Sequence, residues 1–122
     1  MKKRTNYKTG HFAEKIALIF LMLKGYHFVA ANYVTGRGTG AGEIDLIVKK
    51  QKTLVFVEVK KRQNLTTSAE AITTKNQQRV SRGASAFLQK HPEYRQYAVR
   101  FDAVLFQNNF WPHHIPNAWE SL

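Results

Sequence analysis

The stretch that decides the fold lies between residues 42 and 60 and reads Gly-Glu-Ile-Asp-Leu-Ile-Val-Lys-Lys-Gln-Lys-Thr-Leu-Val-Phe-Val-Glu-Val-Lys. It holds two strand-like runs, residues 44–49 and 53–60, joined by Lys50-Gln51-Lys52. Such a pair of runs predicts an antiparallel hairpin. Three of the eight acidic residues of the chain fall within the same stretch. The stretch therefore predicts both a sheet and a concentration of carboxylates.

A two-residue loop at Gln51-Lys52 fixes which residues of this hairpin face one another. It places Asp45 directly opposite Glu58 and Glu43 directly opposite Lys60, with all four side chains on one face. The reverse face is then apolar, with Ile44, Leu46 and Val48 across from Val59, Val57 and Val55. A slip of one residue would spoil both patterns together, so we predict this register.

Like charges directly opposite in a sheet are destabilising, so Asp45 and Glu58 need a compensating partner. A divalent cation between them would supply one, because Mg²⁺ prefers hard oxygen ligands at about 2.0–2.1 Å. Lys60 follows on the same face, where its ammonium could contact a phosphate. Two acids and a lysine around a metal are the parts needed for phosphodiester hydrolysis. On the residues alone, the alternative of a merely solvated face of an amphipathic hairpin stays open.

Upstream of the hairpin, the sequence predicts a basic arm, a helix and a strand. Residues 1–9 carry four basic residues and read as a flexible arm. Residues 11–24 are rich in Ala, Leu, Ile and Met and are followed by Gly25, which predicts a buried helix. Residues 26–33 are aromatic and β-branched, which predicts a short strand. Four glycines in residues 36–42 predict a loop.

Downstream, residues 69–90 carry apolar side chains at helical spacing, and His91-Pro92 ends the predicted helix. Residues 97–106 alternate in a way that predicts a half-buried strand. The tail from Asn108 is expected to pack its aromatic residues on the sheet edge. The order of helix, three strands, helix and strand predicts one α/β domain with a mixed central sheet over residues 10–122.

Charge indicates the class of partner. The chain has 122 residues, with 19 Lys and Arg against 8 Asp and Glu, which gives a formal net charge of +11. Such a surplus on a small domain favours a polyanion, either nucleic acid or an anionic membrane surface. The chain has no cysteine, which excludes disulfides, thiolate zinc sites and a cysteine nucleophile.

Apolar runs argue against insertion into a membrane. The longest, residues 16–23, is far shorter than the roughly 20 residues that a membrane-spanning helix requires. Glu14 and Lys15 interrupt the approach to it, and Lys24-Gly25-Tyr26-His27 is no small-residue cleavage site, so a signal peptide is not expected. We therefore expect a cytoplasmic protein with no membrane partner.

The acidic hairpin carries a resemblance to known nucleases. Gly42-Glu43-Ile44-Asp45-Leu46-Ile47, followed by Val55-Phe56-Val57-Glu58-Val59-Lys60, resembles the metal-site motif of the restriction-endonuclease-like superfamily. In that motif an Asp on one strand is followed by Glu-x-Lys on the next, and Ile44 stands where the motif has a proline. The predicted order of elements is similar to the common core of that superfamily, so the resemblance implies a restriction-endonuclease-like core.

The whole chain more closely resembles the YraN-like family of small bacterial predicted endonucleases, which are similar to Holliday junction resolvases. The segments that carry this likeness are His11-Phe12-Ala13-Glu14, Gly25-Tyr26, the glycine loop, Lys75 and Arg100-Phe101-Asp102. The resemblance implies that Asp45 and Glu58 are metal ligands and that Lys60 is the catalytic lysine. It also implies that Glu14 completes the metal site as a third acid. The implied cofactor is Mg²⁺ or Mn²⁺.

Basic residues outside the hairpin are candidate phosphate contacts. Lys75, Arg79 and Arg82 are spaced i, i+4 and i+7 and form one stripe on the second predicted helix. A solvated helix face is the alternative reading of such a stripe. In a chain of this charge, phosphate binding is about as well supported. Arg37, in the glycine loop, and Arg62, directly after the hairpin, join this predicted nucleic-acid-binding set.

Two further features are given structural roles. His113 and His114 are adjacent and flanked by prolines, so we predict that they lie on the surface and bind no metal. Asp102 lies on the last predicted strand close to Arg100, and we predict that it is a structural ion-pair partner.

The expected function is a metal-dependent endonuclease that acts on DNA, with branched or junction DNA implied as substrate by the resemblance. Two cuts on a symmetric junction would need two sites, which favours a homodimer. The alternative is a catalytically inactive nuclease fold that binds nucleic acid in recombination, DNA uptake or repair. A third reading, from charge alone, is a protein of the membrane surface.

Overall fold

The structure is a computed structural model that describes residues 2–36, 42–61, 72–106 and 111–120. The elements are α1 (Lys2–Leu23), β1 (His27–Thr35), β2 (Gly42–Lys50), β3 (Thr53–Lys61), α3 (Thr74–Lys90), the 3₁₀ helix η2 (Pro92–Tyr94), β4 (Ala98–Phe106) and β5 (Pro112–Trp119). The predicted α/β class, with its helix, three strands, helix and strand, is confirmed. The arrangement is compatible with a nuclease-like core.

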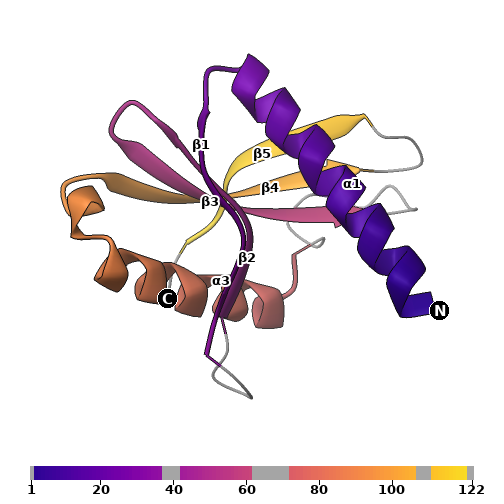
Figure 1. The fold of residues 1–122 in the computed structure, drawn as a ribbon. Helices are drawn as coiled ribbons and strands as arrows, with labels where there is room; N and C mark the ends of the chain where they lie inside the picture. The colour runs from indigo at the N-terminus through magenta and orange to yellow at the C-terminus, as the bar shows by residue number, and fades with distance from the viewer. Residues whose placement is uncertain (1, 37–41, 62–71, 107–110, 121–122) are drawn as a thin grey trace.

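A single mixed sheet organises these elements. Its five strands lie in the order β1-β2-β3-β4-β5, and β3 pairs with β4 in parallel while the other neighbours are antiparallel. The chain crosses from β3 to β4 through α3, because parallel neighbours need a long crossover. The two long helices lie on opposite sides of the sheet (Figure 1).

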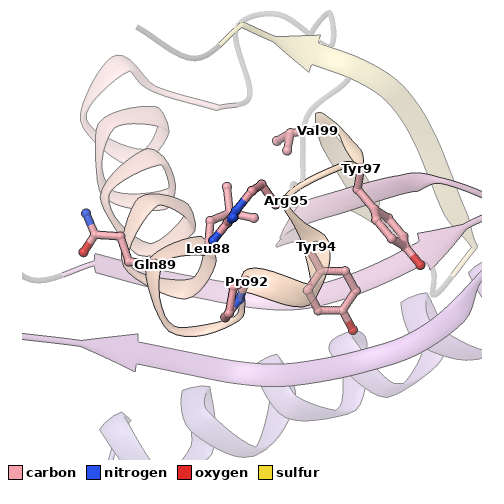
Figure 2. Close-up of a pocket in the computed structure, with 7 residues that line it drawn as sticks. All are labelled: Leu88, Gln89, Pro92, Tyr94, Arg95, Tyr97 and Val99. Carbon is pink, nitrogen blue, oxygen red and sulfur yellow. The ribbon is translucent and has the colours of Figure 1, made fainter.

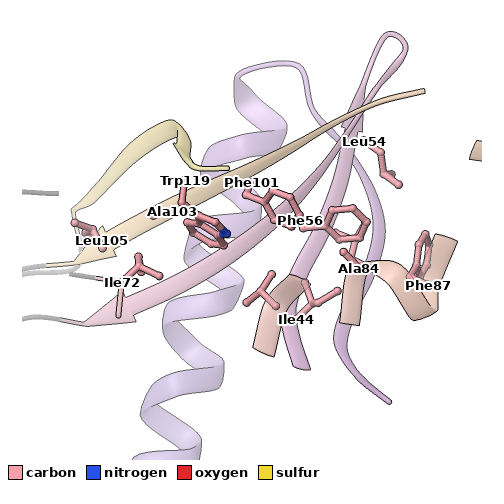
Figure 3. Close-up of a cluster of buried hydrophobic side chains, with 12 residues drawn as sticks. Ile44, Leu54, Phe56, Ile72, Ala84, Phe87, Phe101, Ala103, Leu105 and Trp119 are labelled. Atoms are coloured by element: carbon pink, nitrogen blue, oxygen red, sulfur yellow. The ribbon is translucent and has the colours of Figure 1, made fainter. Parts of the chain in front are cut away.

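The face covered by α3 holds the larger, aromatic core. Phe56 stacks on Phe101, which in turn stacks on Trp119, and Phe87 of α3 meets Phe56 edge to face (Figure 3). The remaining buried members of this α3-face cluster are aliphatic: Ile44, Ile47, Leu54, Ile72, Val80, Ala84, Ala103 and Leu105. Trp119 comes from β5, so the prediction that the tail packs its aromatic residues on the sheet edge is confirmed for Trp119 and wrong for Trp111, which is 74% exposed.

The face covered by α1 holds a smaller aliphatic core. Ala13, Ala17 and Leu21 lie on one stripe of α1 and are buried against the sheet. The sheet contributes Leu46, Val48, Val55, Val57, Val104 and Phe106. Small residues in the helix allow it to lie close to the strands, which brings the neighbouring Glu14 toward the sheet.

The strand β4 differs from the prediction because both of its faces are covered. Every residue from Phe101 to Phe106 is buried, so the predicted half-buried strand is wrong. The fifth strand, β5, pairs along β4 and removes it from the edge, while α1 covers Val104 and Phe106. Polar and apolar residues alternate along this strand, which is typical of a strand with one exposed face. The polar residue Asp102 is nevertheless 0% exposed, so the alternation does not report burial here.

The helix boundaries also differ from the predictions. α1 begins at Lys2, so the predicted start at residue 11 is wrong, while the division into a basic arm (1–9) and a domain (10–122) stays a prediction. The helix ends where Gly25 adopts a φ of +98°, as its glycine predicts. α3 begins at Thr74 rather than residue 69, because the Thr73 hydroxyl caps it by accepting from the backbone N–H of Asn76 at 3.1 Å.

No helix in the described ranges is both long and apolar enough to cross a membrane.

Candidate metal centre

Backbone pairing between β2 and β3 ends next to Asp45, which the sequence makes a candidate metal ligand. Backbone pairing of β2 with β3 follows the predicted register from Lys50↔Thr53 to Leu46↔Val57, and there it ends. The neighbouring pairing of β1 with β2 includes Ala31↔Leu46 and Tyr33↔Ile44 but skips Asp45. Asp45 is therefore released from the sheet ladder on both sides, although it lies inside a strand.

The side-chain carboxylate of Asp45 makes a hydrogen bond to β3 where backbone pairing between the two strands is missing. Its Oδ2 accepts a hydrogen bond from the backbone N–H of Val59 at 2.8 Å. Asn32 of β1 lies across from Asp45 in the register of the two strands. Its φ of 52° is far from the extended range, so β1 is irregular at the position that faces Asp45. β1 and β2 are thus irregular beside this acidic side chain, whereas β3 keeps its pairing with β4 from Thr53 to Lys61 without a shift. A local distortion of this kind is typical of functional sites.

The opening changes which face each residue of β2 occupies. Ile44 packs in the α3-face cluster together with Ile47, whereas Leu46 and Val48 pack under α1. The predicted apolar face that joins Ile44 to Leu46 is therefore wrong at its first member. The alternation shifts because the backbone is irregular at Asp45, and a strict two-residue period does not hold through such a point.

Glu58 is the most enclosed of the site's acids. Its side chain lies in β3 and the residue is only 3% exposed. Lys60 Nζ lies 3.7 Å and Arg79 Nη2 lies 4.0 Å from the same oxygen, Oε2. Burial raises the pKa of Glu58 to about 8, and the charge of Asp45 adds to the rise. The two cations oppose this rise without reversing it.

Glu14 reaches the same place from α1. Its side chain is 16% exposed and its Oε1 lies 3.6 Å from Nδ1 of His11. That oxygen is buried and has no hydrogen-bond partner among the described residues. Burial raises the pKa of Glu14 to about 7, and the charge of Asp45 and a hydrogen bond to it add to the rise. The amide of Asn32 favours the ionised form of Glu14 by hydrogen bonding.

Asp45 links the other two acids. Burial raises its pKa, while hydrogen bonds from the backbone of Val59 and from Glu58 oppose the rise. The charge of Asp45 and hydrogen bonding to it raise the pKa of both Glu14 and Glu58, in addition to the effect of burial. A group of buried carboxyls that raise one another's pKa values is one that a divalent cation would stabilise.

The carboxyls form a loose cluster in this arrangement. Within the described part of the chain, no three His, Cys, Asp or Glu side chains are gathered tightly enough to serve as a ready-made metal site. Metal binding would therefore require the side chains to close around the ion. The donor set nevertheless suits Mg²⁺ or Mn²⁺, because it consists of carboxylate oxygens and includes Oε1 of Glu14, which accepts no hydrogen bond from the described residues.

Two glycines bring α3 close enough to add Arg79. A Cβ built on Gly42 would lie 2.3 Å from the backbone nitrogen of Gly83, and one on Gly83 would lie 2.9 Å from Cγ1 of Ile44. Helix and strand therefore touch backbone to backbone, a distance that only glycine permits. Arg79 lies one turn before Gly83, which explains how it reaches Glu58 on β3.

The predicted phosphate contacts separate into three groups. Arg79 turns toward Glu58, and its Nε is buried with no hydrogen-bond partner in the described ranges. Lys75 and Arg82 are exposed on the same helix. Arg37 and Arg62 lie outside the described residues. The roles of all five in binding nucleic acid stay predictions.

The sequence did not indicate Asn32, His11 or Gly83 as site residues, although His11 belongs to a segment that carries the likeness to the family. Asn32 and His11 flank the carboxyl of Glu14, and Gly83 sets the position of α3. Asn32 lies in an ordinary strand sequence, and nothing in its neighbourhood signals a left-handed backbone. The Gly42 and Gly83 pair could be found only by knowing that the two elements cross.

A second charged cluster lies under α1, away from these acids. Asp102 accepts from Arg100 Nε at 2.8 Å and lies 2.7 Å from Nε2 of His114. Burial would raise the pKa of Asp102, but hydrogen bonds from His114, Arg100 and the backbone of Asn117 outweigh it and lower the pKa. The predicted ion-pair role of Asp102 is confirmed. The predicted surface position is wrong for His114, whose side chain is 2% exposed because Asp102 holds it inside.

A mixed sheet covered on both faces, with acids gathered where its hairpin opens, defines an α/β protein with a candidate metal centre. A family model described as "Uncharacterised protein family UPF0102" matches residues 13–106. The chain belongs to this family, which is also the YraN family, so the resemblance seen in the sequence is confirmed. The matched range contains all three carboxyls of the cluster.

Several curated relatives are similar over nearly the whole chain. UPF0102 protein amb4503 of Paramagnetospirillum magneticum is 44% identical over 112 residues, which cover 92% of this chain and 87% of the relative. A UPF0102 protein of Methylorubrum extorquens is 43% identical, with 98% and 90% covered. Another, from Rhodopseudomonas palustris, is 41% identical, with 94% and 82% covered.

Proposed function

We propose that this protein is a metal-dependent endonuclease that hydrolyses phosphodiester bonds in DNA. The observation that carries the proposal is the meeting of Glu14, Asp45 and Glu58 at the point where the hairpin opens. Lys60 and Arg79 approach the same carboxylate oxygen. Carboxylates can bind a divalent metal ion, and the neighbouring Lys and Arg can bind a phosphate group. Together they form a set suited to phosphodiester hydrolysis.

Asp45, Glu58 and Glu14 are the residues that would hold Mg²⁺ or Mn²⁺. Asp45 is held in place by the backbone N–H of Val59, so one of its oxygens is already oriented. Glu14 would use the buried oxygen that lacks a hydrogen-bond partner in the described part of the structure. When bound, the metal would supply an acidified water as nucleophile and a positive charge for the phosphate.

Lys60 and Arg79 then act on the substrate rather than on Glu58. In the structure, Nζ of Lys60 and Nη2 of Arg79 both lie next to Oε2 of Glu58. Binding of a divalent ion to Glu58 would weaken these two attractions and make the ammonium and guanidinium available to phosphate oxygens. We assign Lys60 to the scissile phosphate and to the attacking water, and Arg79 to a non-bridging phosphate oxygen.

Affinity for DNA is assigned to the charge surplus of the whole chain. The net charge is +11. Lys75 and Arg82 lie before and after Arg79 on α3 and are exposed, so they add positive charge to the surface of this helix. Arg37 and Arg62 belong to the same proposed set. The proposed substrate is junction or otherwise branched DNA. A homodimer would place two sites on such a junction. A cytoplasmic location would give the protein access to DNA.

A second candidate is a nuclease fold that binds nucleic acid without cutting it. It is favoured by the pairing of Glu58 with two cations and by the looseness of the acidic cluster. In this alternative, Arg79 and Lys60 permanently neutralise Glu58. The protein would then act in recombination, DNA uptake or repair through binding alone.

Cleavage assays with matched variants distinguish the two candidates. Purified protein is incubated with labelled linear, nicked and four-way DNA in Mg²⁺, Mn²⁺ or EDTA. The test variants are Asp45→Asn and Glu58→Gln, and the control is Glu93→Gln, which removes an acid whose side chain is 62% exposed. We expect metal-dependent products from the wild type and the control only. Products that persist in both test variants would refute the site, and salt-sensitive binding without any product would establish the second candidate.

A further inference from the structure

A cavity of about 340 Å³ lies at the C-terminal end of α3, away from the acids. Its volume falls within the range of roughly 300–1,000 Å³ that is common for small-molecule sites. The lining comes from the end of α3, from η2 and the turn after it, and from the start of β4 (Figure 2). The lining residues are Leu88, Gln89, Pro92, Tyr94, Arg95, Tyr97 and Val99.

The walls of the cavity are apolar and aromatic. Val99 remains 41% exposed although its neighbours further along β4 are buried. Tyr94 and Tyr97 meet edge to face with ring centroids 5.0 Å apart. A flat, largely apolar ligand would cover Val99 and lie against these rings.

The polar groups at the cavity are neutral or cationic. Arg95 and Gln89 are exposed, and the side chain of neither makes a hydrogen bond or ion pair with another described residue. None of the lining residues is acidic. Glu93 is the nearest acid in sequence, and its carboxylate faces His91 at 3.4 Å instead. The cavity thus offers unused donors to a ligand that carries negative charge.

Two lysines of the β2–β3 hairpin lie over the rings of the two tyrosines, outside the cavity lining itself. Lys49 Nζ lies 5.9 Å from the centroid of the Tyr94 ring, and Lys52 Nζ lies 5.7 Å from that of Tyr97. Aromatic side chains interleaved with Lys and Arg are the arrangement by which proteins hold unpaired nucleotides, through the base and the phosphate together. A purely apolar ligand would leave these charges unused.

The cavity lies on the same side of the sheet as Arg79 and Glu58. Leu88, Tyr94 and Tyr97 pack against the α3-face cluster. Along α3, Leu88 follows Arg79 by nine residues, a rise of about 14 Å. The same nine residues make about two and a half turns of helix, so Arg79 and Leu88 lie on opposite flanks of α3. A nucleic-acid strand that reached both the acids and the cavity would cross α3.

We infer that the cavity binds an unpaired base of the nucleic-acid substrate, with Arg95 on the adjacent phosphate. This inference rests on the proposed function for the identity of the polymer. It deepens that function by naming the substrate class: DNA that carries unpaired nucleotides. A base within a continuous duplex is excluded because it would first have to leave its stack, at a cost of a few kcal/mol.

Binding without cleavage tests the cavity separately from the nuclease. The full chain is titrated in EDTA against a labelled ten-nucleotide oligodeoxythymidylate and an abasic oligomer of equal length and charge. Val99→Phe fills the cavity without changing charge, and Arg95→Gln removes the cation. Lys15→Gln, at an exposed position on α1, is the matched loss of one charge elsewhere. Circular dichroism confirms that each variant is folded.

We expect the wild type to bind oligodeoxythymidylate roughly tenfold more tightly than the abasic oligomer, the preference that one base contact confers. Val99→Phe should abolish this preference. Arg95→Gln should weaken binding of both oligomers severalfold and lower the salt dependence by about 0.7 in log–log slope. Lys15→Gln should retain the preference for bases.

Equal binding of the two oligomers by the wild type, or a preference that survives Val99→Phe, would overturn the inference. Either result would leave the nuclease proposal intact, because cleavage depends on Asp45 and Glu58. Conversely, a preference that behaves as expected in a protein without metal-dependent cleavage would refute the nuclease and retain the cavity. The two proposals therefore fail on different measurements.

Discussion

Raising the pH should destabilise the metal-free protein, with Glu58 as a major cause. The pKa of Glu58 is about 8 in the folded protein against an ordinary value of 4.5. Because the folded pKa is the higher one, its contribution to stability is fully present below pH 4.5 and is lost as the pH rises through 8. Between these values the folded protein keeps a proton that the unfolded chain releases.

The size of the effect follows from the same shift. At about 1.4 kcal/mol per pKa unit, the rise from 4.5 to about 8 corresponds to a loss of about 5 kcal/mol at most in the free energy of unfolding. Glu58 is 3% exposed, so solvent does little to screen this loss. Small domains are stable by only about 5–15 kcal/mol, so the loss should be easy to measure.

Glu58→Gln removes the titrating proton and keeps the shape. Urea unfolding is followed by tryptophan fluorescence at pH 5.5, 7.0 and 8.5 in EDTA, because Trp119 is buried and should report on the loss of the core. The wild type should lose stability steadily over this range, and Glu58→Gln should lose much less. Glu93→Gln, with its exposed side chain, should follow the wild type.

Divalent metal should reverse the loss. At pH 8.5, Mn²⁺ at about 100 times its dissociation constant should stabilise the wild type by about 2.7 kcal/mol. Glu58→Gln should gain much less, since it has lost a ligand. Parallel pH profiles for the wild type and Glu58→Gln would refute the assignment of the buried proton to Glu58. Equal stabilisation of both proteins by Mn²⁺ would refute Glu58 as a ligand.

Three further predictions concern packing, the second charged cluster and DNA binding. Gly42→Ala should lower the melting temperature far more than Gly83→Ala in thermal denaturation, because its Cβ would meet helix backbone, whereas that of Gly83 first meets a side chain. Asp102→Asn should cost about 3–5 kcal/mol in urea unfolding at pH 7, since the guanidinium of Arg100 and the buried imidazole of His114 both lose the carboxylate that they contact; in the wild type the lowered pKa of Asp102 makes this stability fall as the pH falls. A cost below 1 kcal/mol would contradict it. Lys75→Gln and Arg82→Gln should each reduce the log–log salt slope of duplex DNA binding by about 0.9, and unchanged slopes would remove α3 from the interface.

Strong local patterns made much of the fold predictable. The alternating runs of the hairpin gave its register correctly from Lys50↔Thr53 to Leu46↔Val57. The glycine after the first helix predicted the end of that helix, where Gly25 has a positive φ. These features depend on residues close together in the chain, so the sequence carries them directly.

The errors arose where distant segments meet. The strand β4 appeared half-buried because its alternation cannot reveal that β5 and α1 cover it. His114 appeared to be a surface residue because its partner, Asp102, belongs to another strand. In each case a contact between segments reversed the expectation from local polarity.

The sequence by itself determined the class of fold, the order of the elements and the acids that are candidates for a metal. It could do so because hydrophobic period and residue chemistry are local properties. Only the tertiary structure decided that Asp45 leaves the sheet ladder, that Arg79 faces Glu58, and that Glu14 has a buried oxygen without a hydrogen-bond partner in the described part of the chain. These depend on how α1 and α3 pack on the sheet, since burial and neighbouring charges set the protonation of a carboxyl.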